Sequence, residues 1–587
     1  MSYINRTKAE AERYIPRIRV SFHTETACYQ IESDGIGRGE LSDPTKQLLN
    51  VNTSKSIQNP AGIFNLTFTG VEWADKIAPN DIVVICMGYK DGTQLDTVMV
   101  GLIDSVRQNM SLSDNSPNVI TTVQGRDFGK LLIKPALKFY PELAPIKKDG
   151  GAYTEDELAL KKWFLTEVGW ITLLNYFSGI GTRTKGSPAQ MLDIIMRNIF
   201  TKMVDTGWIA YREDKTGAPV KKRLKIGNIV RFQFAKTEFF SLPLYMSLNS
   251  YEGSVWNLME RGCPKPFLEL FVDTRTQNEL YNEDRTNMIV NEGIEASSGL
   301  KSSIADNSYE SKGFEFGEDA SKVVVIMRNT PFDASNWLEL YKHEIEDSDI
   351  LSRDISLSDE EHYNLFWAGI QLNPLGDDLK RVAPPEYDVD NIKKFGLSPL
   401  EITIEAMTID EEDIDEAYPR VQIMTRQLNS KLKRWYKDNH LLYSGSVEVR
   451  GKGNYKIGQK LYIKSIDLVF YIEEVSQSFN LFEGWTTTLG LTRGQNPTKI
   501  QEDGVKNVKD KTNPGQPNKT TTSVKKHKVA KNENLYTIAY NYYKDANKWI
   551  LIWKENKEML IKRDERNRTD LGKWIYEGQI LTIPQEE

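Results

Sequence analysis

The chain has 587 residues, of which 39% are hydrophobic and 27% are charged, and its formal net charge is −7. This length suits roughly three to five domains, and the hydrophobic share is enough to build real cores. Because there is no large basic excess, nucleic acid is not an expected partner.

The three cysteines, Cys28, Cys86 and Cys263, lie far apart in the sequence. A sparse, odd set argues against a disulfide framework and for folding in a reducing cytoplasm. No apolar run is long enough for a membrane span, and the N-terminal segment lacks the apolar core of a secretory signal. We expect a protein of this kind to leave the cell only within a particle or by lysis.

Residues 1–135 are predicted to form a first β domain. Ile18, Val20 and Phe22 alternate with polar residues, as in a half-buried strand. Between residues 59 and 103, three apolar runs of strand length are separated by turn residues such as Pro79 and Asn80. Short β-rich runs broken in this way indicate an antiparallel meander that closes into a small barrel.

Residues 136–320 are predicted to form an α+β insertion with a mobile loop over residues 276–320. Ser187 to Gln190 fits a capping box, with a proline at the first helical position. A second helix is expected after Ser254 and a strand over residues 267–273. The first helix would bury a face made of residues four apart, namely Met191, Ile195, Ile199 and Met203.

Residues 321–440 are predicted to form a mixed α/β connecting domain. An apolar strand begins at Val323, and Ser358 followed by three acids indicates a helix start. A helix is expected after Pro419, with apolar residues three and four apart. The acidic runs at 344–349 and 410–416 could serve glycosidase chemistry, but such runs are more often a solvated face or a helix start.

Residues 441–495 return to a β pattern, and residues 496–526 are rich in Lys, Asn, Thr, Pro and Gly, which is typical of a flexible linker.

Several phrases in these segments resemble the baseplate hub proteins of contractile phage tails and contractile injection systems. They are VQGRDFGKLL from Val123, RNTPFD from Arg328, ISLSDEEHYNLF from Ile355 and TTTLGLTRG from Thr486. The resemblance is to the hubs of phages of Gram-positive bacteria, whose first part is similar to the N-terminal part of VgrG. It implies two small antiparallel β-barrels flanking an α+β insertion. It also implies a homotrimer whose six barrels mimic the sixfold tail tube.

Residues 527–587 resemble a LysM domain, which has βααβ topology. The segment from Ile575 to Pro584 matches the closing strand, and Tyr542, Trp549 and Asn556 match the helical middle. The first loop departs from the family, because Asn-Glu-Asn-Leu stands where a Gly-Asp-Thr/Ser-Leu turn is usual. Asparagine tolerates positive φ, so the turn survives without its glycine.

This resemblance implies a groove for glycan or protein. Its candidate residues are Asn532, Glu533, Asn534, Leu535, Asn556, Tyr576 and Gly578. A LysM module either binds peptidoglycan or serves as an assembly clip. A single copy, an altered loop and a hub in front of it favour the clip.

No catalytic, cofactor or metal residues are predicted. None of the five histidines shows metal-ligand spacing, Cys263 lies in a Gly-Cys-Pro context, and no GxSxG elbow is present. The chain is therefore not expected to be an enzyme.

The leading interpretation is a structural hub that adapts the tail tube to the central spike, while the LysM module clips to baseplate wedge proteins. It would assemble in the bacterial cytoplasm and become part of a virion, a tailocin or an extracellular injection particle. The tape measure protein and peptidoglycan are further candidate partners. The alternatives are a peptidoglycan-binding tail protein or a LysM-anchored cell-wall hydrolase. A wall-binding adhesin is disfavoured because no signal peptide is evident.

Overall fold

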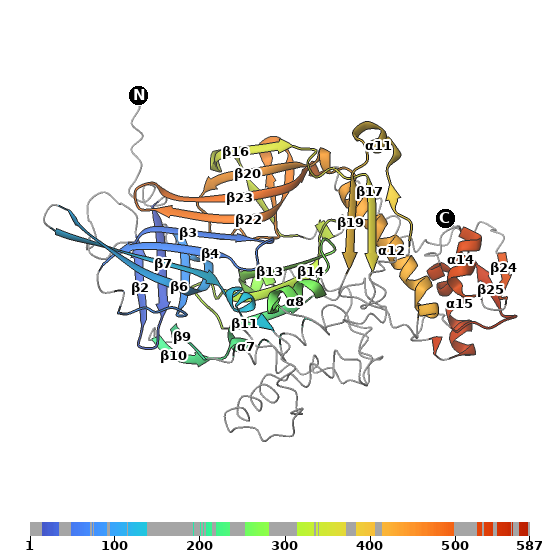
Figure 1. Cartoon of the computed structure of the whole chain (residues 1–587), viewed down its shortest axis with the longest axis horizontal. Helices are drawn as coiled ribbons and strands as arrows, with labels where there is room; N and C mark the ends of the chain where they lie inside the picture. The colour runs from blue at the N-terminus through green and yellow to red at the C-terminus, as the bar shows by residue number, and fades with distance from the viewer. Residues whose placement is uncertain are drawn as a thin grey trace, which may run out of the picture.

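The computed structural model describes residues 15–33, 48–137, 204–234, 253–280, 314–370, 383–404, 414–497 and 525–584, with short gaps inside several of these ranges, together with residues 192, 196 and 200. The described chain is mostly β, with few helices (Figure 1). Its dominant feature is one curled sheet of thirteen strands.

The first group of strands in this sheet is antiparallel throughout, and its order is β3-β4-β7-β6-β5-β1-β2. Its apolar runs become the buried strands that the sequence predicts, and Asn80 takes a φ of 76° in the turn before β5. The bounds are β1 Pro16–His23, β2 Cys28–Ser33, β3 Leu48–Ser56, β4 Ile63–Thr69, β5 Ile82–Tyr89, β6 Asp96–Ser113 and β7 Ser116–Asp127.

The second group comes from residues 342–495. Its strands are β15 Lys342–Ile345, β16 Ile350–Leu357, β20 Tyr443–Arg450, β21 Lys460–Ile463, β22 Leu468–Asn480 and β23 Gly484–Gln495. The N-terminal part of β22 pairs with β21, and its C-terminal part pairs antiparallel with β3, from Glu474 opposite Ser56 to Asn480 opposite Asn50. The two groups therefore belong to one sheet, in which Figure 1 shows β16, β20, β23, β22, β3 and β4 in sequence.

A three-stranded middle sheet lies between two hydrophobic cores. Its strands are β11 Val230–Phe234, β13 Leu268–Arg275 and β14 Lys322–Asn329, with β11 parallel and β13 antiparallel to β14. All eight residues of β13 are buried. Continuous apolar runs are typical of strands covered on both faces.

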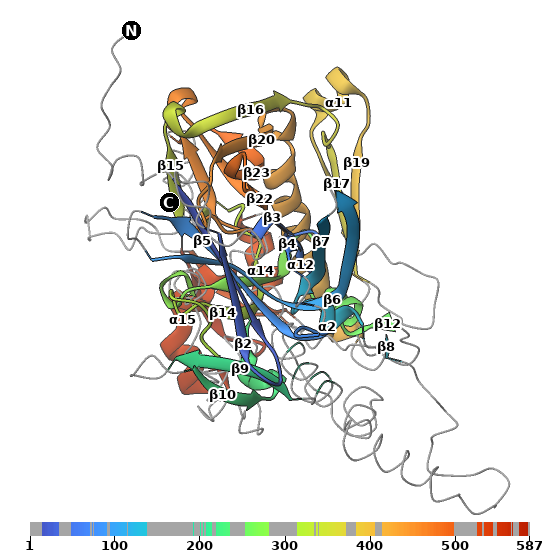
Figure 2. The ribbon, with the colours of Figure 1, turned by 90° about the vertical axis from the view of Figure 1, so that its left-hand side faces the viewer.

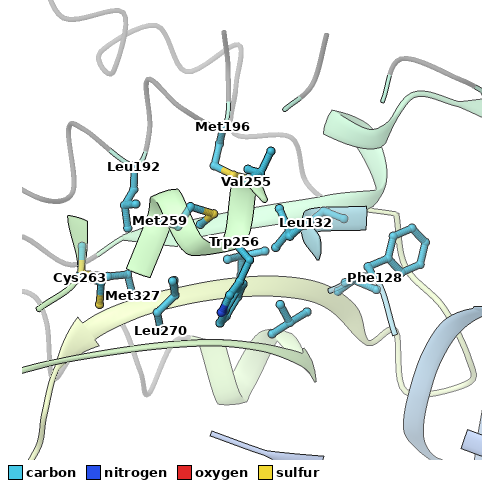
Figure 3. Packing of buried hydrophobic residues seen from close by; sticks show 14 of the residues in the cluster. Phe128, Leu132, Leu192, Met196, Val255, Trp256, Met259, Cys263, Leu270 and Met327 are labelled. Atoms are coloured by element: carbon cyan, nitrogen blue, oxygen red, sulfur yellow. The ribbon is translucent and has the colours of Figure 1, made fainter. Parts of the chain in front are cut away.

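One face of the middle sheet packs against α8, Val255–Gly262, a helix that the sequence predicts. Figure 3 shows the Trp256 ring of α8 pointing toward the sheet that carries Leu270 and Met327. The Ser254 side chain caps this helix by accepting a hydrogen bond from the Asn257 amide at 3.1 Å. The other face carries Phe271 into the core of the second strand group.

A third layer consists of the sheet β18-β17-β19 and two helices. The bounds are β17 Leu365–Ile370, β18 Glu386–Tyr387, α11 Val389–Phe395, β19 Pro399–Ile404 and α12 Ile414–Tyr436. The predicted apolar stripe of α12 is buried from Met424 to Trp435. The helix begins at Ile414, five residues before Pro419, after which the sequence predicts it.

The predicted helix start at Ser358 is wrong. The segment makes a single turn, in which the His362 amide donates to the Asp359 carbonyl, and then enters β17. Asn364 fixes the extended chain, because its Oδ1 accepts from the Ser398 amide at 2.8 Å. The acids are not followed by an apolar stripe that could hold a helix against the core.

The remaining described elements are short. They are α2 Lys130–Ile133, β8 Ala136–Leu137, β9 Trp208–Glu213, β10 Pro219–Leu224, α7 Ile226–Ile229, β12 Gly253–Ser254, η7 Asp347–Asp349, η9 Asn439–Leu441 and η10 Lys464–Ile466. Buried residues also occur at four-residue spacing at Leu192, Met196, Phe200 and Val204. The predicted buried face, one residue earlier, lies outside the described residues, as do most of the predicted mobile loop and residues 498–524 of the predicted linker.

The C-terminal module has β–α–α–β order and a core of its own. Its elements are β24 Lys525–Lys528, α14 Leu535–Tyr543, α15 Trp549–Arg563 and β25 Ile580–Ile583, and β24 pairs antiparallel with β25. Leu535, Ile538, Ile552, Trp553 and Leu581 belong to the buried core. Among the helices of the described chain, none combines the length and apolarity needed to cross a membrane.

Candidate binding site in the C-terminal module

The two loops that carry the predicted groove residues lie side by side. The Gly578 amide donates to the Val529 carbonyl at 2.8 Å, and the Val529 amide donates to the Gln579 carbonyl at the same distance. Gly578 has a φ of 82°, which explains a glycine here, since other residues rarely adopt this conformation. The loop that follows β24 is thereby fixed against the loop that precedes β25.

In the first loop, the candidate carboxylate Glu533 is already bonded to other groups of the module. Glu533 accepts from the Ala530 amide and lies against Nε2 of His527, each at 2.7 Å. The hydrogen bond from the Ala530 amide lowers the pKa of Glu533 the most, and the contact with His527 lowers it further. Asn534 caps α14, because its Oδ1 accepts from the Thr537 amide at 2.9 Å. Asn532 lies outside the described residues.

Two of the predicted groove residues are buried inside the module. Leu535 is 2% exposed and belongs to its core. Asn556 is 4% exposed, and its amide bonds both the N–H and the carbonyl of Thr582, at 2.8 and 2.7 Å. Asn556 therefore completes the free edge of β25 as a neighbouring strand would, and neither residue presents its side chain to a ligand.

A cluster in the second loop was missed by the sequence reasoning. Arg566 makes a two-point ion pair with Asp564, at 2.7 and 3.0 Å, and its guanidinium lies 3.7 Å from the centre of the Trp574 ring. The predicted residue Tyr576, 39% exposed, donates its hydroxyl to Asp564. The Arg566 contacts hold the pKa of Asp564 well below its usual range. The only sequence signal was an acid and a base two positions apart, followed further along the chain by the aromatic residues Trp574 and Tyr576.

The module therefore offers aromatic surface and a charged cluster, which are means of binding. Its two carboxylates with bonded partners, Glu533 and Asp564, are already engaged by groups of the module itself. Within the described parts of the chain, no three His, Cys, Asp or Glu side chains converge to hold a metal ion.

A second concentration of polar groups joins the middle sheet to both strand groups. Lys55 of β3 pairs with Asp273 of β13 at 2.8 Å, and Asp273 also pairs with Arg275 at 2.8 Å. The two cations lower the pKa of Asp273 to about 2 despite its burial. Arg275 also donates a hydrogen bond to the carbonyl of Ile457, which belongs to the second strand group. A cavity of about 10 Å³, enough for one water molecule, lies beside this pair.

The other buried network centres on Arg328 of β14. Arg328 pairs with Glu269 at 3.0 Å and donates to the Tyr471 hydroxyl at 3.0 Å and to the Gly458 carbonyl at 2.8 Å. Tyr471 donates in turn to Glu269 at 2.7 Å. The middle sheet is therefore tied by buried charge to both strand groups.

Comparisons with known proteins give short or weak matches. No family model matches the chain. An uncharacterized Bacillus subtilis (strain 168) protein, YqbP, is 40% identical over 89 residues, which are 15% of this chain, and the match spans 37% of that protein's length.

Solved structures align over more of the chain, at low similarity. A tail protein from Neisseria meningitidis MC58 aligns over 81% of this chain and 96% of its own, with a TM-score of 0.39 and 11% identity. The 43 kDa tail protein of prophage MuSo2 from Shewanella oneidensis aligns over 81% of this chain and 98% of its own. The TM-score is 0.38 and the identity is 11%. The E. coli c3393 protein, a component of the type VI secretion system, aligns over 77% of this chain and 74% of its own. The TM-score is 0.31 and the identity is 8%. TM-scores of this size are too low to assign a fold or a function.

Proposed function

We propose that this chain is the structural baseplate hub of a contractile tail, a homotrimer that adapts the tail tube to the central spike. The observation that carries the proposal is the β22–β3 joint. It joins a strand of residues 1–135 to a strand of residues 441–495, the two segments that the family resemblance assigns to barrels, side by side in one sheet. Three such chains would supply six similar units, which is the number needed to meet a sixfold tube.

The interior suits an adapter that transmits force. The middle sheet is buried between two cores and is bonded to the first group through Lys55 and to the second through Tyr471. Rotation of one group against the other would separate buried charges from their partners, which is costly. The two groups are therefore expected to move as one body, and the mechanism is geometric, without bond chemistry.

We further propose that the C-terminal module is a LysM-type clip for neighbouring baseplate proteins. Glu533, Asn534 and Asp564 already bond groups within the module. A sugar groove relies on polar side chains that are available to hydroxyl groups, whereas a protein partner can be held by exposed aromatic surface such as Tyr576. Peptidoglycan binding is the second candidate, favoured by the same exposed ring.

The test uses the particle-producing strain with the full chain or a chain that lacks residues 525–587. We expect full-length protein at the baseplate of purified particles, located by labelled antibody in electron micrographs, and failure of baseplate assembly with the shortened chain. Particles that assemble normally but adsorb poorly to cell walls would favour peptidoglycan binding. Clearing of a purified peptidoglycan suspension by the full-length protein would contradict the structural function.

A further inference from the structure

The two-stranded sheet of the C-terminal module has one face and one edge that the module itself covers. The helices α14 and α15 lie together (Figures 1 and 2), and Leu581 and Ile583 of β25 belong to the core that these helices build. At the edge of β25, the Asn556 side chain bonds the N–H of Thr582 at 2.8 Å and its carbonyl at 2.7 Å. Asn556 thereby takes the place of a third strand on this side.

The opposite edge of the same sheet belongs to β24. Within the described part of the chain, β24 pairs with β25 alone, and Lys526 stands directly opposite Thr582. In an antiparallel pair, opposite residues direct their backbone groups either toward each other or both away. Because the backbone groups of Thr582 face Asn556, those of Lys526 also point away from the partner strand, onto the outer edge of β24.

This outer edge is open in the single chain. None of the described residues bonds the N–H and carbonyl of Lys526 in the way that Asn556 bonds those of Thr582. Proteins normally protect such an edge, because its open backbone groups are a template for another strand. The module protects one edge of its small sheet and leaves the other available.

The side chains along this edge favour an acidic partner. Lys526 and Lys528 are exposed and, as alternate residues of one strand, lie on the same face. Neither forms an ion pair with a described residue, since Glu533 of the neighbouring loop bonds His527 and the Ala530 amide instead. Lysines at an edge oppose pairing with ordinary strands, whereas carboxylates on the facing strand form favourable cross-strand pairs with them.

We propose that the outer edge of β24 binds an extended acidic segment of a neighbouring baseplate protein, which adds a third strand to the sheet beside Lys526 and Lys528. A strand is favoured over a free anion because the open edge presents both a donor and an acceptor, and an anion supplies acceptors only. Backbone bonds give such a contact its affinity, and side chains give it specificity. The inference rests on the proposed clip and names the chemistry of its partner.

Hydrogen exchange with residue-level fragmentation tests whether a strand is added. The full-length protein is compared free in solution and within purified particles. The Lys526 amide, which faces the open edge, should exchange at least about tenfold more slowly in the particles. The His527 amide faces β25 and is the internal control, with no change expected. Unchanged exchange at Lys526 in particles that contain the protein would overturn the inference.

A zero-length carbodiimide, which joins lysine amines to carboxylates, tests the chemistry of the partner. In purified particles we expect links from Lys526 or Lys528 to Asp or Glu of a second protein, identified by mass spectrometry. Lys526→Arg with Lys528→Arg keeps both charges but removes both amines, so it should assemble normally and lose these links. Links only to carboxylates of this chain, such as those of residues 410–416, would overturn the assignment to a partner protein.

A charge reversal tests whether the edge contributes to assembly. Lys526→Glu with Lys528→Glu should lower the yield of assembled particles by at least about tenfold, because like charges would then face each other. Hydrogen exchange of α15 and β25 in the free variant should be unchanged, which shows that the module is folded. Lys557→Glu, at an exposed position of α15, is the matched control and should assemble normally.

The outcomes separate this inference from the proposed clip. If the chain lacking residues 525–587 fails to assemble while the double glutamate variant assembles normally, the inference is overturned and the clip stands. If the shortened chain assembles normally, the clip is overturned and the inference with it.

Discussion

The middle sheet and the C-terminal module are both held by buried polar side chains, but the two regions use different chemistry over different distances. In the middle sheet, charged groups join residues 218 and 202 positions apart, as in Lys55–Asp273 and Tyr471–Glu269. In the module, neutral amides join residues 26 and 7 positions apart, as in Asn556–Thr582 and Asn567–Trp574.

This difference indicates two tasks. Desolvation offsets most of the Coulombic gain of a buried ion pair, so such a pair adds little net stability but strongly penalises a wrong arrangement. That property suits the alignment of remote segments. A neutral amide that completes a strand edge is less costly to bury, and it suits a small module whose segments are already close along the chain.

The largest effect is expected for Arg328→Ala. This change leaves Glu269 buried without its cation, which should lower the free energy of unfolding by about 3–5 kcal/mol. Urea unfolding of the full-length chain, followed by tryptophan fluorescence, measures it. Lys393→Ala, at a side chain that is 74% exposed, is the matched control and should change the value by less than about 0.5 kcal/mol. A loss below about 1 kcal/mol in Arg328→Ala would show that the network contributes little to the middle sheet.

Asn556→Ala should break the module and spare the middle sheet. The change leaves the N–H and carbonyl of Thr582 without their side-chain partner, at a cost of about 1–3 kcal/mol. Hydrogen exchange with mass spectrometry on the full chain should show faster exchange in α15 and β25 only. Lys557→Ala, at the exposed neighbouring position, should leave exchange unchanged. Faster exchange in β13 as well would mean that the two regions are energetically coupled.

Gly458→Ala isolates the packing around Arg328. A Cβ at this position would lie 2.4 Å from Nη2 of Arg328, and the φ of 76° adds backbone strain, for a total cost of about 1–3 kcal/mol. Gly484→Ala is the matched control, because its φ is 98° but no atom lies within 4 Å of the added Cβ. The difference between the two variants in urea unfolding measures the contact alone, and equal losses would contradict it.

The last test is a pH dependence at Asp127. Burial raises the pKa of Asp127 to about 6 from an ordinary value of 3.8, so the folded state holds this proton more tightly than the unfolded state. Stability should therefore fall as pH rises through this window. Asp127→Asn should remove that component, so the wild-type-minus-variant difference in unfolding free energy should slope downward between pH 4 and 6. A flat difference would show that Asp127 titrates normally.

The individual strands were predictable because apolar alternation and continuous apolar runs are local properties. Ile82 to Tyr89 forms a strand because its residues are buried on both faces. The β22–β3 joint was not predictable, because nothing in the sequence near Ser54 specifies a partner 420 positions away. The buried charges that align the two groups were missed for the same reason.

The candidate site was predicted only in part. The order of strands and helices in residues 525–584 was evident from the resemblance, but the direction in which each side chain points was not. Leu535 and Asn556 were expected in a groove and lie inside the module. The Asp564–Arg566 pair was overlooked because an acid and a base two positions apart look like ordinary surface charge until the fold brings Trp574 and Tyr576 beside them.

The most direct test of the hub is the mass of the full-length protein in solution, measured by sedimentation velocity over a wide concentration range. The chain has a mass of 67.2 kDa, and the predicted result is a species of three times that mass that dissociates on dilution without a stable dimer. A monomer at every concentration, or a dimer as the final state, would contradict a trimeric adapter between a sixfold tube and a central spike.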